Sequence, residues 1–164
     1  MQTPLKSMEQ LMPFATAGEL IAKKAQPVVP VTPETTVSVA MERMTQMEVG
    51  LVVVLHGDQL AGVVSERDCA RAVVLRSQDP RTTPVREVMT SSVYTVRPDT
   101  RIPECVKLMH EKGIGHLPVA VEGRVQGVLS IRDLMGALIE RYERLLRRFQ
   151  EDRLTLLFPD PSSY

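Results

Sequence analysis

One seven-residue phrase occurs twice in this chain. Residues 62–68 read GVVSERD and residues 127–133 read GVLSIRD, an offset of 65 positions (127 − 62). With that offset held without a gap, residues 28–73 and 93–138 share 13 identical residues in 46 pairs, whereas composition alone gives roughly three. The chain is therefore an internal repeat, and any function proposed for it should exist in two related copies.

Each copy is predicted to form a β-α-β-β-α unit. A short segment rich in β-branched residues opens the unit, and apolar residues at helical spacing follow it. We expect Thr35 and Thr100 to cap these helices, and Gly50 and Gly115 to end them. Two apolar strands then form a hairpin in each copy. The predicted strand pairs are 51–55 with 60–64 and 117–121 with 125–129.

The segments outside the two copies are predicted to be helical. Apolar periodicity favours a helix near residues 18–24, and the pair Thr83 and Pro84 favours a short helix that ends at Met89. After the second copy, an apolar stripe continues the last helix to about residue 157. An amphipathic extension of this length must pack against its own domain or against a second subunit.

The composition argues against several classes of partner. The 20 basic and 20 acidic residues cancel, so no net field attracts nucleic acid or an anionic membrane. Aromatic residues make up 4% of the chain, with no Trp, which argues against a base-stacking surface. The longest apolar run, residues 51–55, is too short to span a bilayer. We expect a cytoplasmic protein without nucleic-acid or membrane partners, in which Cys69 and Cys105 are free thiols.

Catalysis is not expected. The sequence has no Ser-His-Asp spacing, no metal-binding set of histidines or carboxylates, and no Gly-x-x-x-x-Gly-Lys loop. The three histidines, His56, His110 and His116, are predicted to lie on a turn, a helix and a strand edge. We therefore predict no catalytic residue, no metal site and no required cofactor.

The repeated phrase has two physical interpretations. Ser65 with Asp68, and Ser130 with Asp133, match a capping box, in which the serine caps a helix and the aspartate favours its positive end. Alternatively, the serine donates to a phosphate, the aspartate accepts from a ribose diol, and the arginine between them supplies positive charge. The glycine that opens each phrase would then make room for a flat ring, and the helix would offer unpaired N–H groups to the phosphate.

These residues resemble the cystathionine β-synthase (CBS) domain, whose tandem pair is called a Bateman module. The resemblance covers about residues 27–140. It rests on Val-x-Pro-x-Thr at 31–35 and its counterpart at 96–100, Gly-His-Leu-Pro-Val at 115–119, the glycine-led hairpins and both Ser-x-x-Asp phrases. The fold class expected from it is α+β, with two β-α-β-β-α repeats related by a pseudo-twofold axis and, in this chain, a C-terminal helical extension.

The resemblance also implies an organisation and a ligand class. The expected segments are an N-terminal helical segment at 1–26, repeat one at 27–76, a linker with a short helix at 77–91, repeat two at 92–140 and the helical extension at 141–164. Such pairs commonly form homodimers and bind AMP, ADP, ATP or S-adenosylmethionine in the cleft between the repeats. This implies a regulatory module that passes ligand binding to an unknown partner protein or to its own assembly; the alternative is a ligand-free structural element for dimerisation or assembly.

The resemblance assigns roles to particular residues. For the second site they are Thr90 and Val93 beside the adenine, Gly115 and His116 on the opposite wall, Ser130 and Arg132 at the phosphate, and Asp133 at the ribose. The counterparts in the first copy are Val28, Gly50, Leu51, Ser65, Arg67 and Asp68. Because Ala25 and Leu51 stand where the second copy has Thr90 and His116, we predict tighter binding at the Asp133 site. Two alternatives are that both arginines form intersubunit salt bridges and that His116 is structural.

Overall fold

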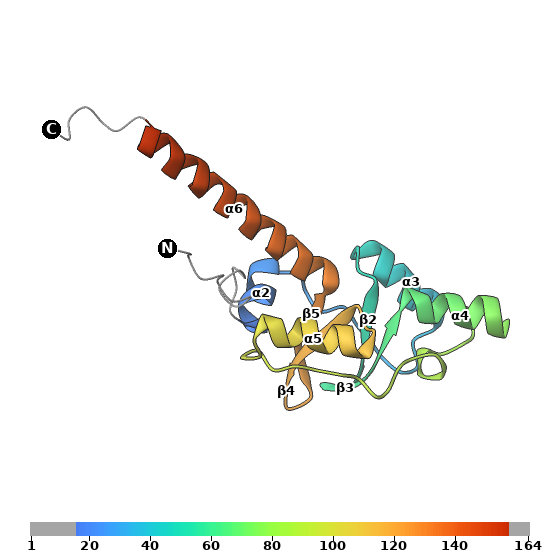
Figure 1. The fold of residues 1–164 in the computed structure, drawn as a ribbon. Coiled ribbons are helices and arrows are strands. Elements are labelled where there is room, and N and C mark those ends of the chain that lie inside the picture. Colours follow the sequence, from blue (N-terminus) through green and yellow to red (C-terminus); the bar gives the residue numbers. More distant parts are fainter. Residues whose placement is uncertain (1–15, 158–164) are drawn as a thin grey trace.

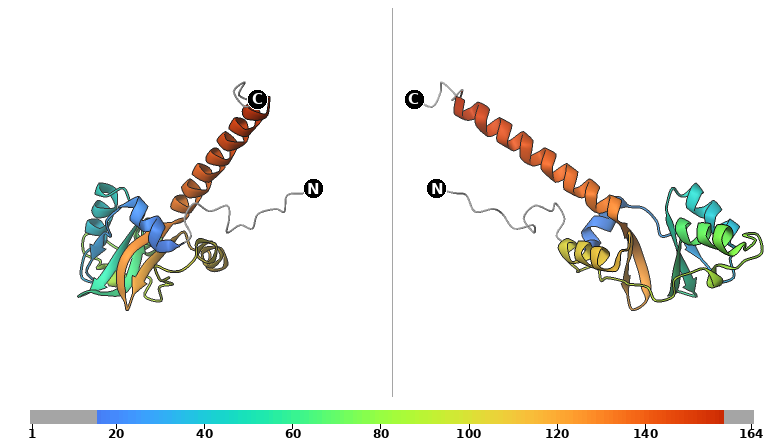
Figure 2. Two further views of the ribbon diagram at one scale, coloured as in Figure 1. Left: turned by 90° about the vertical axis from the view of Figure 1, so that its left-hand side faces the viewer. Right: turned by 45° about the vertical axis from the view of Figure 1, so that its right-hand side comes forward.

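The computed structural model describes residues 16–157, except for the side chains of residues 141 and 148–157. Residues 1–15 and 158–164, which belong to the two predicted terminal segments, lie outside the described residues. Two small α/β units lie next to one another, and a long C-terminal helix projects from them (Figures 1 and 2). The fold is the predicted α+β class.

Each repeat follows the predicted element order. The first repeat contains β1 (Pro30–Val31), α3 (Val37–Gln46), β2 (Leu51–His56), β3 (Gln59–Ser65) and α4 (Glu66–Arg76). The second contains α5 (Ile102–Lys112), β4 (His116–Val121), β5 (Arg124–Ser130) and α6 (Ile131–Leu157). In the first sheet β1 is parallel to β2, which is antiparallel to β3. A parallel bridge between Val96 and Val119 takes the place of β1 beside the antiparallel β4–β5 pair.

The duplication extends to irregular backbone features. The hairpin register shifts between Val54 and Leu55 in one repeat, and at the equivalent step after Val119 in the other. The chain also turns left-handed at equivalent positions, Glu48 with φ 52° and Gly113 with φ 62°. The prediction that Gly50 and Gly115 end the helices is therefore wrong, because the reversal occurs two residues earlier.

The predicted helix caps Thr35 and Thr100 are also wrong. Their hydroxyls accept from the backbone N–H of Thr32 and Arg97, each at 3.0 Å, and so close the turn that precedes each helix. The residues at the N-cap positions are their neighbours, Thr36 and Arg101, which make no side-chain cap hydrogen bond. A threonine hydroxyl near a helix start can accept a hydrogen bond from the preceding turn or from the first turn of the helix. Here it accepts from the proline-containing turn.

The segment before each repeat packs on the other repeat. The predicted helix near 18–24 is confirmed as α2 (Ala17–Lys24), and its Ala17 and Leu20 are buried in the core of the second repeat. Before the second repeat, the predicted short helix is only a 3-10 turn, η1 (Val85–Glu87), and its Val85 is buried in the core of the first repeat. The two cores are thus completed by exchanged segments, as a pseudo-twofold arrangement requires.

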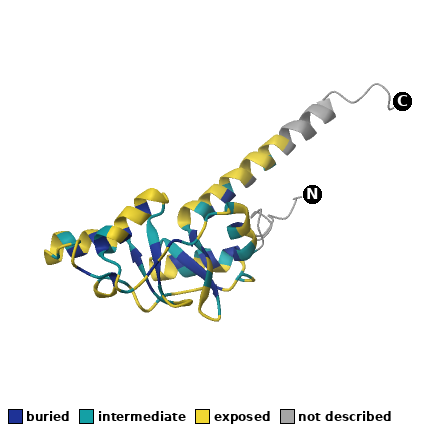
Figure 3. Cartoon of the chain, turned by 180° about the vertical axis from the view of Figure 1, so that it is seen from behind, coloured by how far each residue is buried: buried dark blue, intermediate teal, exposed yellow. Residues whose placement is uncertain are grey.

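The last helix confirms the predicted extension to residue 157. α6 is much longer than its counterpart α4, which ends at the left-handed Ser77. Figure 3 shows mostly exposed residues along the part of α6 that leaves the body. Large apolar side chains are among them: Met135, Ile139, Tyr142 and Leu146. Within residues 16–157, no helix has both the length and the apolarity needed to cross a bilayer.

Both cysteines are free and buried, one in each core. Burial raises the pKa of the Cys69 and Cys105 thiols to about 11. Because the thiolate is the reactive form, both side chains behave as small apolar core residues.

Candidate functional site

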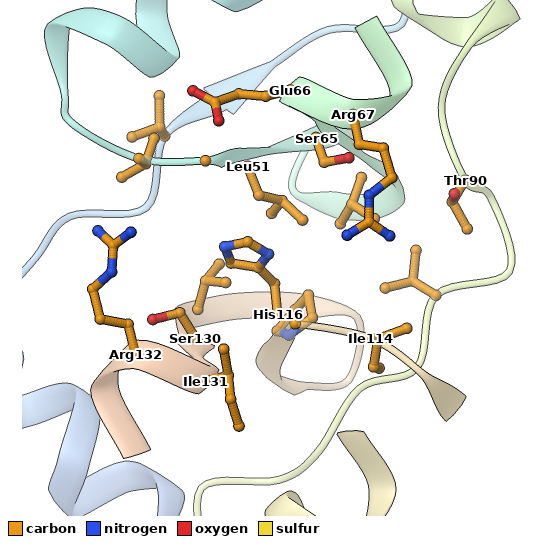
Figure 4. Close-up of a pocket in the computed structure, with 18 of the residues that line it drawn as sticks. Leu51, Ser65, Glu66, Arg67, Thr90, Ile114, His116, Ser130, Ile131 and Arg132 are labelled. Carbon is orange, nitrogen blue, oxygen red and sulfur yellow. The ribbon is translucent and has the colours of Figure 1, made fainter. Parts of the chain in front are cut away.

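A cleft of about 780 Å³ is lined by residues of both repeats. This volume is within the roughly 300–1,000 Å³ of small-molecule sites. All thirteen residues that the sequence singled out line it: Val28, Gly50, Leu51, Ser65, Arg67, Asp68, Thr90, Val93, Gly115, His116, Ser130, Arg132 and Asp133. Figure 4 shows several of their side chains gathered around His116. The structure therefore brings the two copies of the phrase to one common cleft.

Both copies of the phrase form a complete capping interaction. Ser65 donates from its N–H and hydroxyl to Asp68 Oδ2, at 2.9 and 2.6 Å, and its hydroxyl accepts from the Asp68 N–H at 3.3 Å. Ser130 and Asp133 repeat the pattern at 2.7, 2.7 and 3.2 Å. The capping-box interpretation is thus confirmed. It does not exclude ligand binding, since the capped helix starts line the cleft.

The first-turn N–H groups are less available than predicted. The Glu66 N–H donates to the Gly50 carbonyl at 3.2 Å, and the Ile131 N–H donates to the Gly115 carbonyl at 2.9 Å. With the N–H groups of Asp68 and Asp133 already in the caps, an anion must rely more on side chains. The cleft offers four basic ones, Lys24, Arg67, Arg71 and Arg132.

Lys24 is the main charged partner in the second half of the cleft. Its Nζ donates to Asp133 Oδ2 at 2.9 Å and to the Val128 carbonyl at 3.3 Å. Burial raises the pKa of Asp133, but the hydrogen bonds from Lys24 and Ser130 outweigh burial and hold the pKa below its ordinary value. Asp133 is therefore a carboxylate at neutral pH.

His116 lies between the two repeats. A side-chain carbon built on Gly50 would lie at ordinary contact distance from the His116 ring, 3.6 Å, and from a Glu66 carboxylate oxygen, 3.7 Å. The His116 ring of the second repeat therefore lies close to Gly50 and Glu66 of the first. Burial lowers the pKa of His116, and the charges of Lys24 and Arg132 lower it further, against the opposite effect of Asp133 and Glu66. The imidazole is neutral at neutral pH, with one donor and one acceptor nitrogen.

This pKa depression makes stability depend on pH. Unfolded His116 titrates near 6.5, and the folded protein resists its protonation. The contribution of His116 to the free energy of unfolding is therefore fully present above pH 6.5. It is lost as the pH falls through the lowered pKa of the folded state. We expect His116→Leu, which copies Leu51 of the other repeat, to flatten the pH dependence of urea unfolding between neutral pH and about pH 5. An unchanged pH slope in this variant would assign the effect to other groups.

Thr90 belongs to the opposite half of the cleft from the one predicted. Its backbone forms two hydrogen bonds with Val63 of the first repeat, at 2.9 and 3.0 Å. In Figure 4 its side chain lies on the Arg67 side, away from Arg132. The family resemblance grouped Thr90 with Asp133, but the segment exchange pairs Thr90 with Val63 in the repeat that contains Ser65 and Asp68.

The glycines that open the two phrases have another role than the one predicted. A side-chain carbon at Gly62 would lie 2.8 Å from Met89 Sδ and 2.9 Å from the Thr90 carbonyl oxygen, and one at Gly127 would lie 3.0 Å from Ile21. Neither glycine lines the cleft. They make room for the exchanged segments rather than for a ligand ring.

Several cleft residues escaped sequence reasoning. Lys24 precedes the first repeat, so nothing in the sequence links it to Asp133. Glu66 and Arg71 lie on α4 without an equivalent in the second copy, and Tyr94 supplies an aromatic ring beside Val93. Lys112 lies 5.0 Å from the centre of that ring. No cluster of three or more potential metal ligands occurs in the described part of the chain.

The chain matches the CBS domain family over residues 17–75 and 85–140. It therefore belongs to this family, as a tandem pair of CBS domains. Pairs of CBS domains are regulatory modules. Both matches include the exchanged segment that precedes each repeat.

Three similar proteins place the chain within the family. A mitochondrial CBS domain-containing protein of Arabidopsis thaliana is 35% identical over 122 residues, which cover 71% of this chain and 59% of that protein, so the chain spans about three fifths of this relative. A solved protein with CBS domains from Burkholderia ambifaria is 35% identical, with a TM-score of 0.72 over 76% of this chain and 94% of that one. A CBS domain protein from Pyrobaculum aerophilum, solved in complex with AMP, is 29% identical, with a TM-score of 0.67 over 78% and 98%.

Proposed function

We propose that this protein is a regulatory module that binds adenosine nucleotides, of the AMP, ADP, ATP or S-adenosylmethionine class, in the cleft between its repeats. The observation that carries the proposal is the convergence of both serine-aspartate pairs on one cleft lined by four basic side chains. Carboxylates suit a ribose diol, and basic groups suit phosphate. The AMP complex of the Pyrobaculum aerophilum relative supports this ligand class.

The thirteen cleft residues keep the roles expected from the family, with Thr90 moved to the Asp68 half. Tyr94 adds an aromatic face for a base. Within the described residues, neither Arg67 nor Arg132 has an ion-pair partner, so both remain available for a phosphate. The proposed repeats are 27–76 and 92–140.

The wider proposal concerns partners and location. Ligand binding shifts the balance between arrangements of the repeats or subunits, which requires different affinities for the two arrangements. We propose a cytoplasmic homodimer that signals to an unknown protein, without an activity as an enzyme and without nucleic-acid or membrane partners. A ligand-free assembly role is the second candidate, favoured by the exposed apolar side chains of α6, including Ile139 and Leu146.

A thermal-shift panel separates these two functions. A ligand at 100 times its dissociation constant adds about 2.7 kcal/mol to stability, or several degrees in Tm for a domain of this size. We expect such a shift with at least one adenosine ligand, and its loss in the double variant Asp68→Asn, Asp133→Asn. No shift with any of the four ligands at millimolar concentration would favour the assembly role. A full shift in the double variant would remove both carboxylates from the site.

A further inference from the structure

Lys24 makes the two halves of the cleft unequal. It is the last residue of α2, which is anchored in the second core by Ala17 and Leu20. Its ion pair with Asp133 is largely shielded, with the two side chains 24% and 18% exposed. The ammonium group is therefore held beside the second carboxylate by a segment that precedes the first repeat.

This contact gives the Asp133 carboxylate a charged hydrogen-bond donor within the cleft. Asp133 Oδ2 already accepts from the N–H and hydroxyl of Ser130, both at 2.7 Å, and from Lys24 at 2.9 Å. Ribose hydroxyls are neutral donors and bind a carboxylate less strongly than an ammonium group does. Displacing Lys24 would also leave a partly buried charge without its partner. A sugar at Asp133 therefore competes with a stronger donor.

The first half of the cleft has no such competitor. Asp68 Oδ2 accepts only from Ser65 among the hydrogen bonds of residues 16–157, and no cation pairs with it there. The residue that matches Lys24 at the repeat offset (24 + 65 = 89) is Met89, whose thioether cannot donate a proton. Thr90 and Arg67 lie on this same side (Figure 4). The Asp68 carboxylate can therefore accept hydrogen bonds from a diol without displacing a cation.

We propose that Lys24 is an internal occupant of the second nucleotide site and sets the order in which the cleft fills. The inference rests on the proposed nucleotide function. The first nucleotide binds through Asp68, and the Asp133 site accepts one only after Lys24 leaves its carboxylate. This order is the reverse of the one expected from comparing the two copies. That comparison did not include the contact that the exchanged segment makes with Asp133 through Lys24.

Isothermal titration of the full chain with AMP tests the proposal. We expect wild type to bind one AMP per chain tightly. Lys24→Met, which copies Met89, should bind a second AMP at least about tenfold more tightly than wild type does. Lys23→Met is the matched control, because Lys23 is the adjacent lysine of α2 and pairs with Glu140 outside the cleft. This control should titrate like wild type.

Two further variants show which carboxylate binds the first AMP. Asp68→Asn should weaken the first AMP at least about tenfold, and Asp133→Asn should weaken it less. The asparagine side chain can still accept the serine N–H, so both variants keep a helix cap. If Asp133→Asn weakens the first AMP more than Asp68→Asn does, or if Lys24→Met titrates like wild type, the proposed order is wrong while nucleotide binding stands. If wild type and Lys24→Met both fail to bind millimolar AMP, the AMP site and the Lys24 mechanism fail together.

Discussion

Gly62→Ala is expected to lower the free energy of unfolding by about 2–3 kcal/mol, at the upper end of overpacking costs. The new side-chain carbon would lie 2.8 Å from Met89 Sδ and 2.9 Å from the Thr90 carbonyl oxygen. Thr90 cannot retreat without losing its two backbone hydrogen bonds to Val63. Urea unfolding followed by circular dichroism measures the change.

Two other glycines provide controls for Gly62. At Gly127 the nearest atoms belong to the side chain of Ile21 and lie slightly farther away, at 3.0 to 3.1 Å, so Gly127→Ala should cost less, about 1 kcal/mol. Gly136 lies inside α6 with nothing within 4 Å, and alanine there should stabilise by up to about 1 kcal/mol. If Gly62→Ala costs no more than Gly127→Ala, the Met89–Thr90 segment is not held against β3 as described.

Leu20→Ala is expected to destabilise the protein by about 2–4 kcal/mol, as for other buried leucines. Leu20 is 5% exposed and packs in the core of the second repeat. Its removal leaves a cavity between α2 and that repeat. Urea unfolding gives the magnitude, and hydrogen exchange gives the location: amide protection should fall first in β4 and β5.

The matched control for Leu20 is Leu146→Ala. Leu146 is 60% exposed on α6, so its truncation should change stability by less than about 0.5 kcal/mol. Loss of protection confined to β2 and β3 in Leu20→Ala would mean that α2 supports the repeat that it precedes, against the segment exchange. A cost for Leu146→Ala similar to that for Leu20→Ala would instead indicate that α6 is buried in an assembly.

Local patterns were sufficient for much of the fold. The alternation of apolar runs and turn residues predicted both hairpins, and the structure extends each strand by one or two residues. Ser65 and Ser130 were predicted helix starts, and both are N-caps, because a serine followed three residues later by an aspartate satisfies the helix end without distant partners. Features that depend on a few neighbouring residues could therefore be predicted.

Predictions failed where one residue had two local partners or a distant one. Thr35 and Thr100 could cap a helix or close a turn, and both hydroxyls form their hydrogen bond within the turn. Gly62 was interpreted as space for a ligand, but Met89 and Thr90 fill that space. Lys24 was not predicted in the cleft, since its contact with Asp133 spans 109 positions of the chain. In each case, the choice depends on packing between segments that are distant in sequence.

The resemblance to the CBS family supplied the residues expected in the cleft. The amino-acid sequence by itself determined the duplication and the element order of each repeat. These follow from hydrophobic periodicity and from short-range capping, which each copy contains in full. Only the tertiary structure decided which half of the cleft each residue serves. The segments before the repeats cross to the opposite core, because Leu20 and Val85 bury their side chains there, and this crossing brings Lys24 to Asp133 and Thr90 to the side of Asp68.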